Sequence, residues 1–203
     1  MSMGCYYHLS QRSTNDKSVE KDKLDYWIES FRHYMLCVFY GLPLVHKDGI
    51  LLSTVSVFIL LTKAIYLTTL FISCRDKRYI VLKLVGVITF MVAIVLLTLF
   101  AIQSSSAKQT FVGVICVVSY FICSVRVPLS SIKTVVETKS VEHIPLRLYS
   151  LNFIGAVIWT AYSLTYIFDL YALIASGLGT LLCGSQLIAY AIYNRSTPKV
   201  KTE

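Results

Sequence analysis

The chain has 203 residues, of which 56% are hydrophobic and 15% are charged, and its formal net charge at pH 7 is +8. Soluble domains usually carry about 25% charged residues, and the apolar residues here lie in runs of about 20, enough to cross a bilayer as a helix. The composition argues against a soluble enzyme, a disordered regulator and a disulfide-rich secreted module, and it predicts an all-α polytopic membrane protein.

In chain order, the first apolar run is Tyr34–Val45, which is short because extending it upstream brings Glu29, Arg32 and His33 into the helix. A run of this length is also typical of a buried or interfacial helix. We count it as a span because the loop charges require it. Five longer runs predict transmembrane helices over Ile50–Ser73, Tyr79–Ile102, Phe111–Leu129, Tyr149–Phe168 and Leu170–Tyr193.

The basic residues predict the orientation of these six spans. Both tails and every second loop share one side, which holds nearly all the lysines and arginines outside the spans, whereas the opposite side holds only Lys47 and Lys108. The positive-inside rule therefore places both tails, residues 1–16 and 194–203, in the cytoplasm. These loops, with their attraction to anionic lipid, account for the positive charge without a nucleic-acid partner.

An internal duplication predicts the domain organisation. Lys17–Glu20 reads KSVE and recurs as Lys139–Glu142, and the same offset of 122 gives eight identities over 26 positions. In the second copy, residues 111–193, the motif follows a full span, so the repeating unit is a three-helix bundle. With residues 79–102 as a linker helix the two repeats are parallel. Only 16 polar residues precede the first motif, so we expect the first repeat, residues 17–73, to lack its first helix, leaving six spans instead of seven.

The cysteines and histidines form no pattern typical of catalysis or metal binding. No CxxC motif occurs, and the four histidines, His8, His33, His46 and His143, are expected to lie outside the apolar cores. There is also no glycine loop that would cradle phosphate. We therefore expect neither an enzyme, nor a cofactor, nor a metal site.

Residues 128–164 read PLSSIKTVVETKSVEHIPLRLYSLNFIGAVIWTAYSL, residues 177–193 read GLGTLLCGSQLIAYAIY, and the first repeat contains YGLPLVHKD and STV. These motifs at these spacings strongly resemble the SWEET family of bidirectional sugar transporters, over about residues 17–193. The resemblance implies facilitated, ion-independent transport of mono- or disaccharides by alternating access. It also implies a plant plasma membrane or vacuole as location, and homo- or hetero-oligomers with other SWEET-like chains.

The resemblance also implies a sugar pocket. Trp159 matches the family's pocket tryptophan, Cys37 lies opposite it under the repeat offset, and Ser56 and Ser176 take the places of two pocket asparagines. Each assignment has an alternative, because Trp159 could be an ordinary core aromatic and each serine could bond to its own helix. Losing two partners worth about 1 kcal/mol each would weaken sugar binding tens of fold.

Gate and hinge positions follow from the same resemblance. Tyr40 and Asp169 match the outward-facing gate, although either residue is also suited to anchoring at the membrane interface. Pro128 and Pro145 match two hinge prolines, with a simple helix end as the alternative. Tyr26 stands where the first repeat would carry a hinge proline.

Lys63 lies in the middle of a predicted span, where an ammonium group costs about 2.5–3.5 kcal/mol on insertion scales. Such a lysine faces the bundle interior or a wet cavity, or it extends to the interface. Arg126, near the end of its span, either extends to the cytoplasmic surface or points inward and obstructs the inner vestibule.

A second function is compatible with the same residues. The chain could be a transport-inactive SWEET-like subunit that oligomerises with full-length relatives and modulates them. The small residues of the last span would allow the necessary close helix packing; they are Ser176, Gly177, Gly179 and Gly184.

Overall fold

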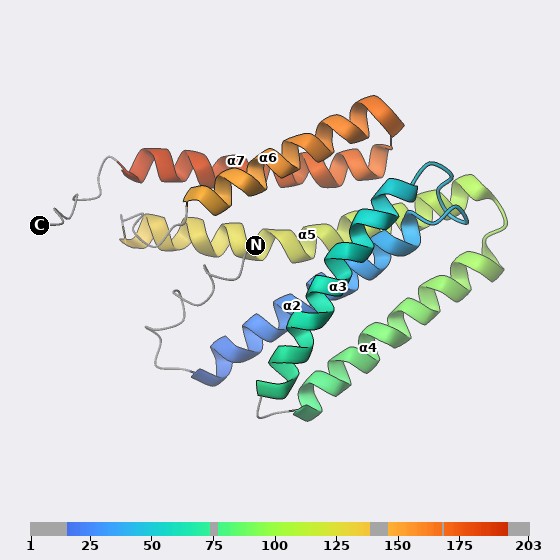
Figure 1. The fold of residues 1–203 in the computed structure, drawn as a ribbon, viewed down its shortest axis with the longest axis horizontal. Coiled ribbons are helices and arrows are strands. Elements are labelled where there is room, and N and C mark those ends of the chain that lie inside the picture. The colour runs from blue at the N-terminus through green and yellow to red at the C-terminus, as the bar shows by residue number, and fades with distance from the viewer. Residues whose placement is uncertain (1–15, 74–76, 139–145, 168, 195–203) are drawn as a thin grey trace, which may run out of the picture. The chain divides into compact units, whose positions relative to one another are not determined.

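The computed structural model describes residues 16–73, 77–138, 146–167 and 169–194. Within them lie the helices α2 (Asp16–Tyr40), α3 (Ile50–Ser73), α4 (Lys77–Leu96), α5 (Ser105–Thr138), α6 (Leu146–Tyr162) and α7 (Leu170–Asn194) (Figure 1). Two π-helical segments, η1 (Leu97–Ala101) and η2 (Ser163–Ile167), continue α4 and α6. No strand occurs in these residues, and the expectation of an all-α fold is confirmed.

Among the residues that the structure describes, four segments are long and apolar enough to span a membrane, namely Ile50–Ile72, Lys77–Ala101, Ser105–Val125 and Leu170–Tyr193. α6 has 17 residues before its π-helical continuation. α2 is much longer than the apolar run Tyr34–Val45, because it begins at Asp16, and it ends earlier, at Tyr40. The chain is thus a multi-pass membrane protein in which α2 carries the most polar sequence of the described helices.

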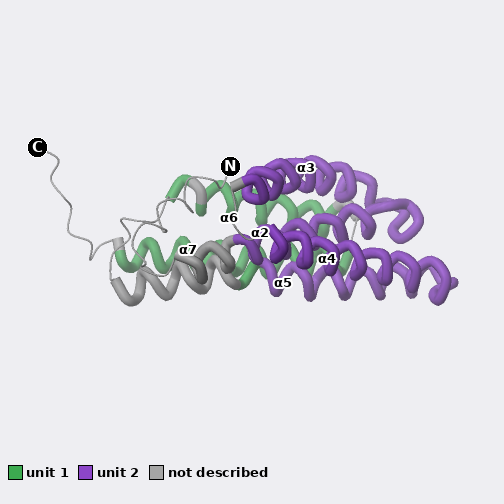
Figure 2. The backbone as a smooth tube through the Cα atoms, turned by 90° about the horizontal axis from the view of Figure 1, so that it is seen from below, with its two compact units in different colours: residues 1–14, 124–203 green, residues 15–123 purple. Residues whose placement is uncertain are grey.

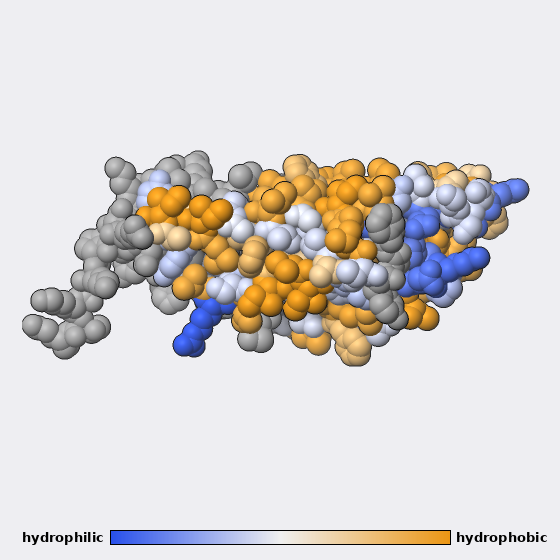
Figure 3. All heavy atoms as spheres, turned by 90° about the horizontal axis from the view of Figure 1, so that it is seen from above, coloured by the Kyte–Doolittle hydropathy of each residue, from blue (hydrophilic) through white to orange (hydrophobic). Residues whose placement is uncertain are grey.

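Much of the apolar side-chain surface is left exposed (Figure 3). On α3, Phe58, Leu61 and Ile65 are 68%, 56% and 71% exposed. Their spacing of three and four residues places them on one helix face. An apolar stripe of this kind is suited to contact with lipid acyl chains.

The chain divides into two compact units, shown in green and purple in Figure 2. Unit 2, residues 15–123, contains α2, α3, α4 and the first part of α5; unit 1 contains residues 124–203 together with residues 1–14. In unit 2, α2 packs against α3 and α4. The core of this packing consists of Leu24, Ile28, Leu67, Ile80 and Val87.

Polar contacts support the α2–α4 packing. The Tyr79 hydroxyl donates to Asp25 Oδ1 at 2.8 Å, and Lys83 Nζ lies 3.3 Å from the same oxygen. Arg32 and Glu29, which make the upstream part of α2 polar, form an ion pair with each other. These pairs reduce the cost of placing charged side chains on α2.

The turn between α2 and α3 is closed by two glycines. The Gly41 N–H donates to the Cys37 carbonyl at 3.0 Å, and the Ser53 N–H donates to the Gly49 carbonyl at 3.0 Å. The Ser53 hydroxyl donates to the Val38 carbonyl at 3.0 Å, joining the start of α3 to α2. A Cβ on Gly41 would lie 2.6 Å from the Gly49 carbonyl oxygen, so the two sides of the turn touch through their backbones.

The Lys63 side chain lies against a cluster of aromatic rings between α2 and α3. Its ammonium nitrogen lies 4.3 Å from the Trp27 ring centroid and 5.9 Å from that of Tyr26. The Trp27 ring stacks on Tyr66 with centroids 4.0 Å apart. Of the alternatives open for Lys63, the structure places its side chain against the bundle, with cation–π attraction offsetting part of the cost of its charge.

Substituting Trp27 with leucine is expected to lower the apparent melting temperature of the detergent-solubilised protein. The substitution removes a desolvated cation–π contact worth about 2 kcal/mol and leaves the Lys63 ammonium group without its main neighbour. The Trp27→Leu/Lys63→Met double variant should regain part of the loss, because the embedded charge is gone. Strictly additive effects of the two substitutions would show that the contact contributes nothing.

In unit 1, α6 packs against α7. The Thr160 and Thr180 hydroxyls lie 3.0 Å apart across the two helices. A Cβ on Gly184 would lie 3.5 Å from the Phe153 ring, an ordinary contact distance. This helix pair carries two of the predicted pocket residues.

Candidate functional site

Trp159 lies near the end of α6 and is half-buried. Its ring meets Tyr162 edge-on, with centroids 5.6 Å apart and an interplanar angle of 90°. The Ser163 hydroxyl donates to the Trp159 carbonyl at 2.8 Å, at the point where the α-helix becomes the π-helical segment η2. π-Helical turns occur frequently at functional sites. Part of the indole surface is thus left available for the flat apolar face of a sugar ring.

The Ser176 hydroxyl bonds to its own helix, which is the alternative to sugar binding that serine chemistry allows. Its hydroxyl is bonded within α7, 2.8 Å from the Ala172 carbonyl and 3.3 Å from that of Leu173. The hydrogen of the hydroxyl is therefore committed to the helix backbone, whereas the oxygen lone pairs can still accept. A sugar would find an acceptor here, with less capacity than an asparagine side chain offers.

Cys37 and Ser56 lie in unit 2, on α2 and α3. Ser56 is buried, with 3% of its surface exposed. Cys37 is half-buried, and its Sγ lies 3.4 Å from His33 Nε2. The expectation that the histidines lie outside the apolar cores is wrong for His33 and His46, because only 7% of the surface of each is exposed. His33 is buried where the Tyr120 ring of α5 lies against it, with the two ring centroids 5.5 Å apart.

The predicted gate residues have local roles that the sequence did not indicate. Tyr40 is the last residue of α2, is 2% exposed, and its ring centroid lies 5.6 Å from that of His46. Asp169 is 4% exposed, and its Oδ1 accepts from the N–H groups of Tyr171 at 3.0 Å and Ala172 at 3.3 Å. Asp169 is therefore the N-cap of α7.

The two roles of Asp169 can be separated by substitution. Asp169→Ala is expected to destabilise the protein by about 1 kcal/mol, whereas Asp169→Asn should keep its stability, because asparagine caps as well as aspartate. If the carboxylate also acts in the gate, Asp169→Asn alters uptake at unchanged melting temperature. Equal melting temperatures for the alanine and asparagine variants would contradict the capping role.

Of the hinge prolines, Pro128 lies inside α5, which continues to Thr138. The simpler interpretation, that Pro128 only marks the end of a helix, therefore does not apply. Pro145 lies outside the described residues. The position of Tyr26 falls within the uninterrupted helix α2.

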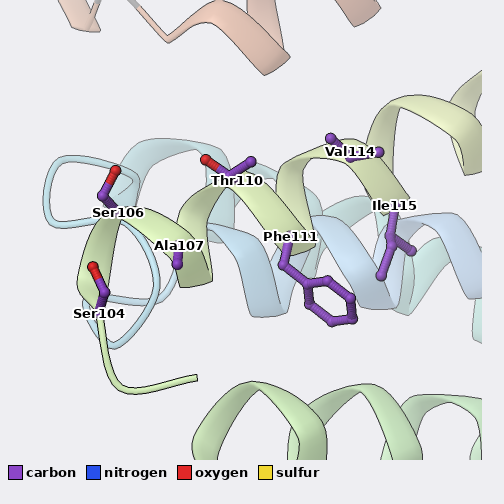
Figure 4. Close-up of a pocket in the computed structure, with 7 residues that line it drawn as sticks. All are labelled: Ser104, Ser106, Ala107, Thr110, Phe111, Val114 and Ile115. Atoms are coloured by element: carbon purple, nitrogen blue, oxygen red, sulfur yellow. The ribbon is translucent and has the colours of Figure 1, made fainter. Parts of the chain in front are cut away.

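A cavity of about 670 Å³ lies beside the first turns of α5 (Figure 4). Its lining is mostly apolar, with the side chains of Thr110 and Phe111 among those that border it. None of the predicted pocket residues lines it. An open, apolar hollow at a helix start is better suited to a lipid chain than to a sugar, and we do not assign it to the sugar site.

The structure gives each unit two of the four predicted pocket residues. Unit 2 holds Cys37 and Ser56, and unit 1 holds Trp159 and Ser176. Within the described residues, no three His, Cys, Asp or Glu side chains gather as metal ligands. Unit 1 thus offers an aromatic face and a hydroxyl, and unit 2 offers a thiol and a hydroxyl; such uncharged groups can each contact a neutral, hydroxyl-rich ligand.

Comparison with known proteins agrees with this chemistry. A family model described as a sugar efflux transporter for intercellular exchange matches residues 110–198. The chain is 43% identical to the bidirectional sugar transporter SWEET8 of Arabidopsis thaliana over 190 residues, which is 92% of this chain and 79% of that protein. This chain belongs to the SWEET family. It is also 36% identical to SWEET7b of Oryza sativa subsp. indica, over 93% of this chain and 71% of that protein.

The SWEET fold is matched in three dimensions as well. A solved structure of a eukaryotic SWEET transporter aligns with a TM-score of 0.76 and 27% sequence identity, covering 84% of this chain and 79% of that one. The resemblance inferred from the motifs is thus confirmed. A SWEET chain is a member of a transporter family, in keeping with the expectation that it is not an enzyme.

Proposed function

We propose that this SWEET chain carries mono- or disaccharides in both directions across a membrane, by alternating access and driven by the sugar gradient alone. The observation that carries the proposal is the 43% identity over 92% of the chain to a protein named as a bidirectional sugar transporter. The half-buried Trp159 and the small polar side chains at positions 37, 56 and 176 support it, since they suit an uncharged polyol.

The proposal includes a topology. Residues 17–73 and 111–193 are two parallel repeats flanking the linker span 79–102, with both tails in the cytoplasm and the plasma membrane as the working location. The supporting observation is the distribution of basic residues, of which only Lys47 and Lys108 fall in the loops assigned to the outside. Labelling of single cysteines placed in the tails and loops, by an impermeant maleimide on intact cells, tests this topology.

The transport proposal is tested by uptake of labelled glucose and sucrose in yeast that lacks its hexose carriers, with surface expression confirmed. Uptake should be saturable, insensitive to protonophores, and matched by efflux from preloaded cells. A protein that is present at the surface but carries neither sugar would overturn the proposal.

A transport-inactive, modulating subunit is the second candidate. The specific observation in its favour is that a Cβ added to Gly177 on α7 would have no described atom within 4 Å, so a helix of another chain could approach closely there. Co-expression with a full-length relative distinguishes the two. Reduced uptake by the relative, reversed by Gly177→Leu, favours the modulating role.

A further inference from the structure

His33 is a buried imidazole in the second half of α2, with an exposed fraction of only 7%. Its Nε2 lies 3.4 Å from the Cys37 Sγ, and its ring centroid lies 5.5 Å from that of Tyr120 on α5. In the part of the chain that the structure describes, its Nδ1 has no hydrogen-bonding partner. Buried polar groups are nearly always paired, so this nitrogen requires an explanation.

A second buried group without a partner lies on the opposite helix. Ser119 on α5 is 4% exposed, and its Oγ has no partner among the described atoms. α2 and α5 run in opposite directions in unit 2 (Figure 1), with Cys116 near Cys37 and Tyr120 near His33. Ser119, which precedes Tyr120, therefore lies at the level of His33.

The chemistry of the two groups narrows the choice of ligand. In a neutral imidazole one ring nitrogen donates and the other accepts, and the Cys37 thiol is compatible with either assignment for Nε2. Nδ1 is then either an acceptor or a donor. A hydroxyl group satisfies both cases, because it donates and accepts, and so it also suits the Ser119 hydroxyl.

We propose that His33 Nδ1 hydrogen-bonds a hydroxyl of the transported sugar, with the Ser119 hydroxyl as a second contact on the facing helix. His33 would then be a specificity-determining residue one helical turn from the predicted pocket residue Cys37. This inference rests on the proposed sugar transport and adds two contacts to the site that the family resemblance predicted.

Three substitutions of His33 separate its two nitrogens. An asparagine amide reaches roughly the position of Nδ1, a glutamine amide that of Nε2, and a phenylalanine ring fills the space with neither. In concentration-dependent uptake, His33→Phe and His33→Gln are expected to raise KM about five- to tenfold, the cost of one hydrogen bond, with Vmax and surface level nearly unchanged. His33→Asn should stay within about twofold of the wild type, and Ser119→Ala should raise KM by several-fold.

A series of deoxyglucoses tests for direct contact. If Nδ1 binds one hydroxyl, one deoxyglucose should inhibit wild-type glucose uptake about five- to tenfold more weakly than glucose does, and its inhibition constant should not change in His33→Phe. Equal losses for every analogue would overturn the inference, since they would mean that His33 only supports the packing.

The inference and the transport proposal fail in different ways. A wild type that carries sugar, together with His33 and Ser119 variants of unchanged KM, would overturn the inference and leave transport standing. A purified wild type that neither transports nor binds labelled glucose would overturn both.

Discussion

Replacing Trp159 with alanine is expected to reduce sugar transport at subsaturating concentration by roughly thirtyfold, while the protein still reaches the membrane. The half-buried indole offers flat apolar area that a sugar ring can cover, and losing it costs about 2 kcal/mol of binding free energy. Labelled-glucose uptake, normalised to surface protein, is the measurement. Trp159→Phe should retain an intermediate activity, because phenylalanine keeps part of the aromatic face.

The matched control is Tyr162→Phe, which keeps the edge-on ring contact with Trp159 and removes only a hydroxyl. It should transport at close to the wild-type rate. Normal transport by the Trp159→Ala variant would show that Trp159 is an ordinary core aromatic, which is the alternative that the sequence left open.

Replacing Gly41 with alanine is expected to cause the largest loss of stability of the substitutions considered. The added Cβ would lie 2.6 Å from the Gly49 carbonyl oxygen and 2.7 Å from the Ser53 nitrogen, and both atoms belong to the backbone. Because neither atom can rotate away, the α2–α3 turn must open, at a cost of about 3 kcal/mol. The loss would be measured as a lower apparent melting temperature in detergent and less protein at the cell surface.

Gly86 provides the matched control for this prediction. It lies within α4, and an added Cβ would have no described atom within 4 Å. Gly86→Ala should therefore leave the melting temperature unchanged or raise it slightly, since alanine is the better helix former. Equal destabilisation by the two substitutions would contradict the steric explanation.

The sequence predicted the uniformly apolar helices α3 and α7, and α4 together with its continuation η1, to within a few residues, because hydropathy alone defines their ends. It predicted α2 poorly for a physical reason. The polar residues of α2 are paired with each other or with α4, as in Arg32 with Glu29 and Asp25 with Tyr79, and hydropathy cannot detect such pairing.

Only part of the candidate site could be predicted from the sequence. The backbone bond of Ser176 follows from the chemistry of serine in a helix, whichever fold contains it. The burial of His33 could not be predicted, since it depends on Tyr120 of a helix distant in the chain. The one local signal was the spacing of four residues between His33 and Cys37, which places them on one helix face.

The positions of Trp27 and Trp159 have a spectroscopic consequence. They are the two tryptophans of the chain, one in each compact unit. Trp27 is 7% exposed and stacked on Tyr66, with the Lys63 ammonium group over its ring, whereas Trp159 is half-buried in the candidate sugar site. The tryptophan emission of a Trp27→Phe variant would therefore come from Trp159 alone. Its fluorescence would report sugar occupancy without any attached dye.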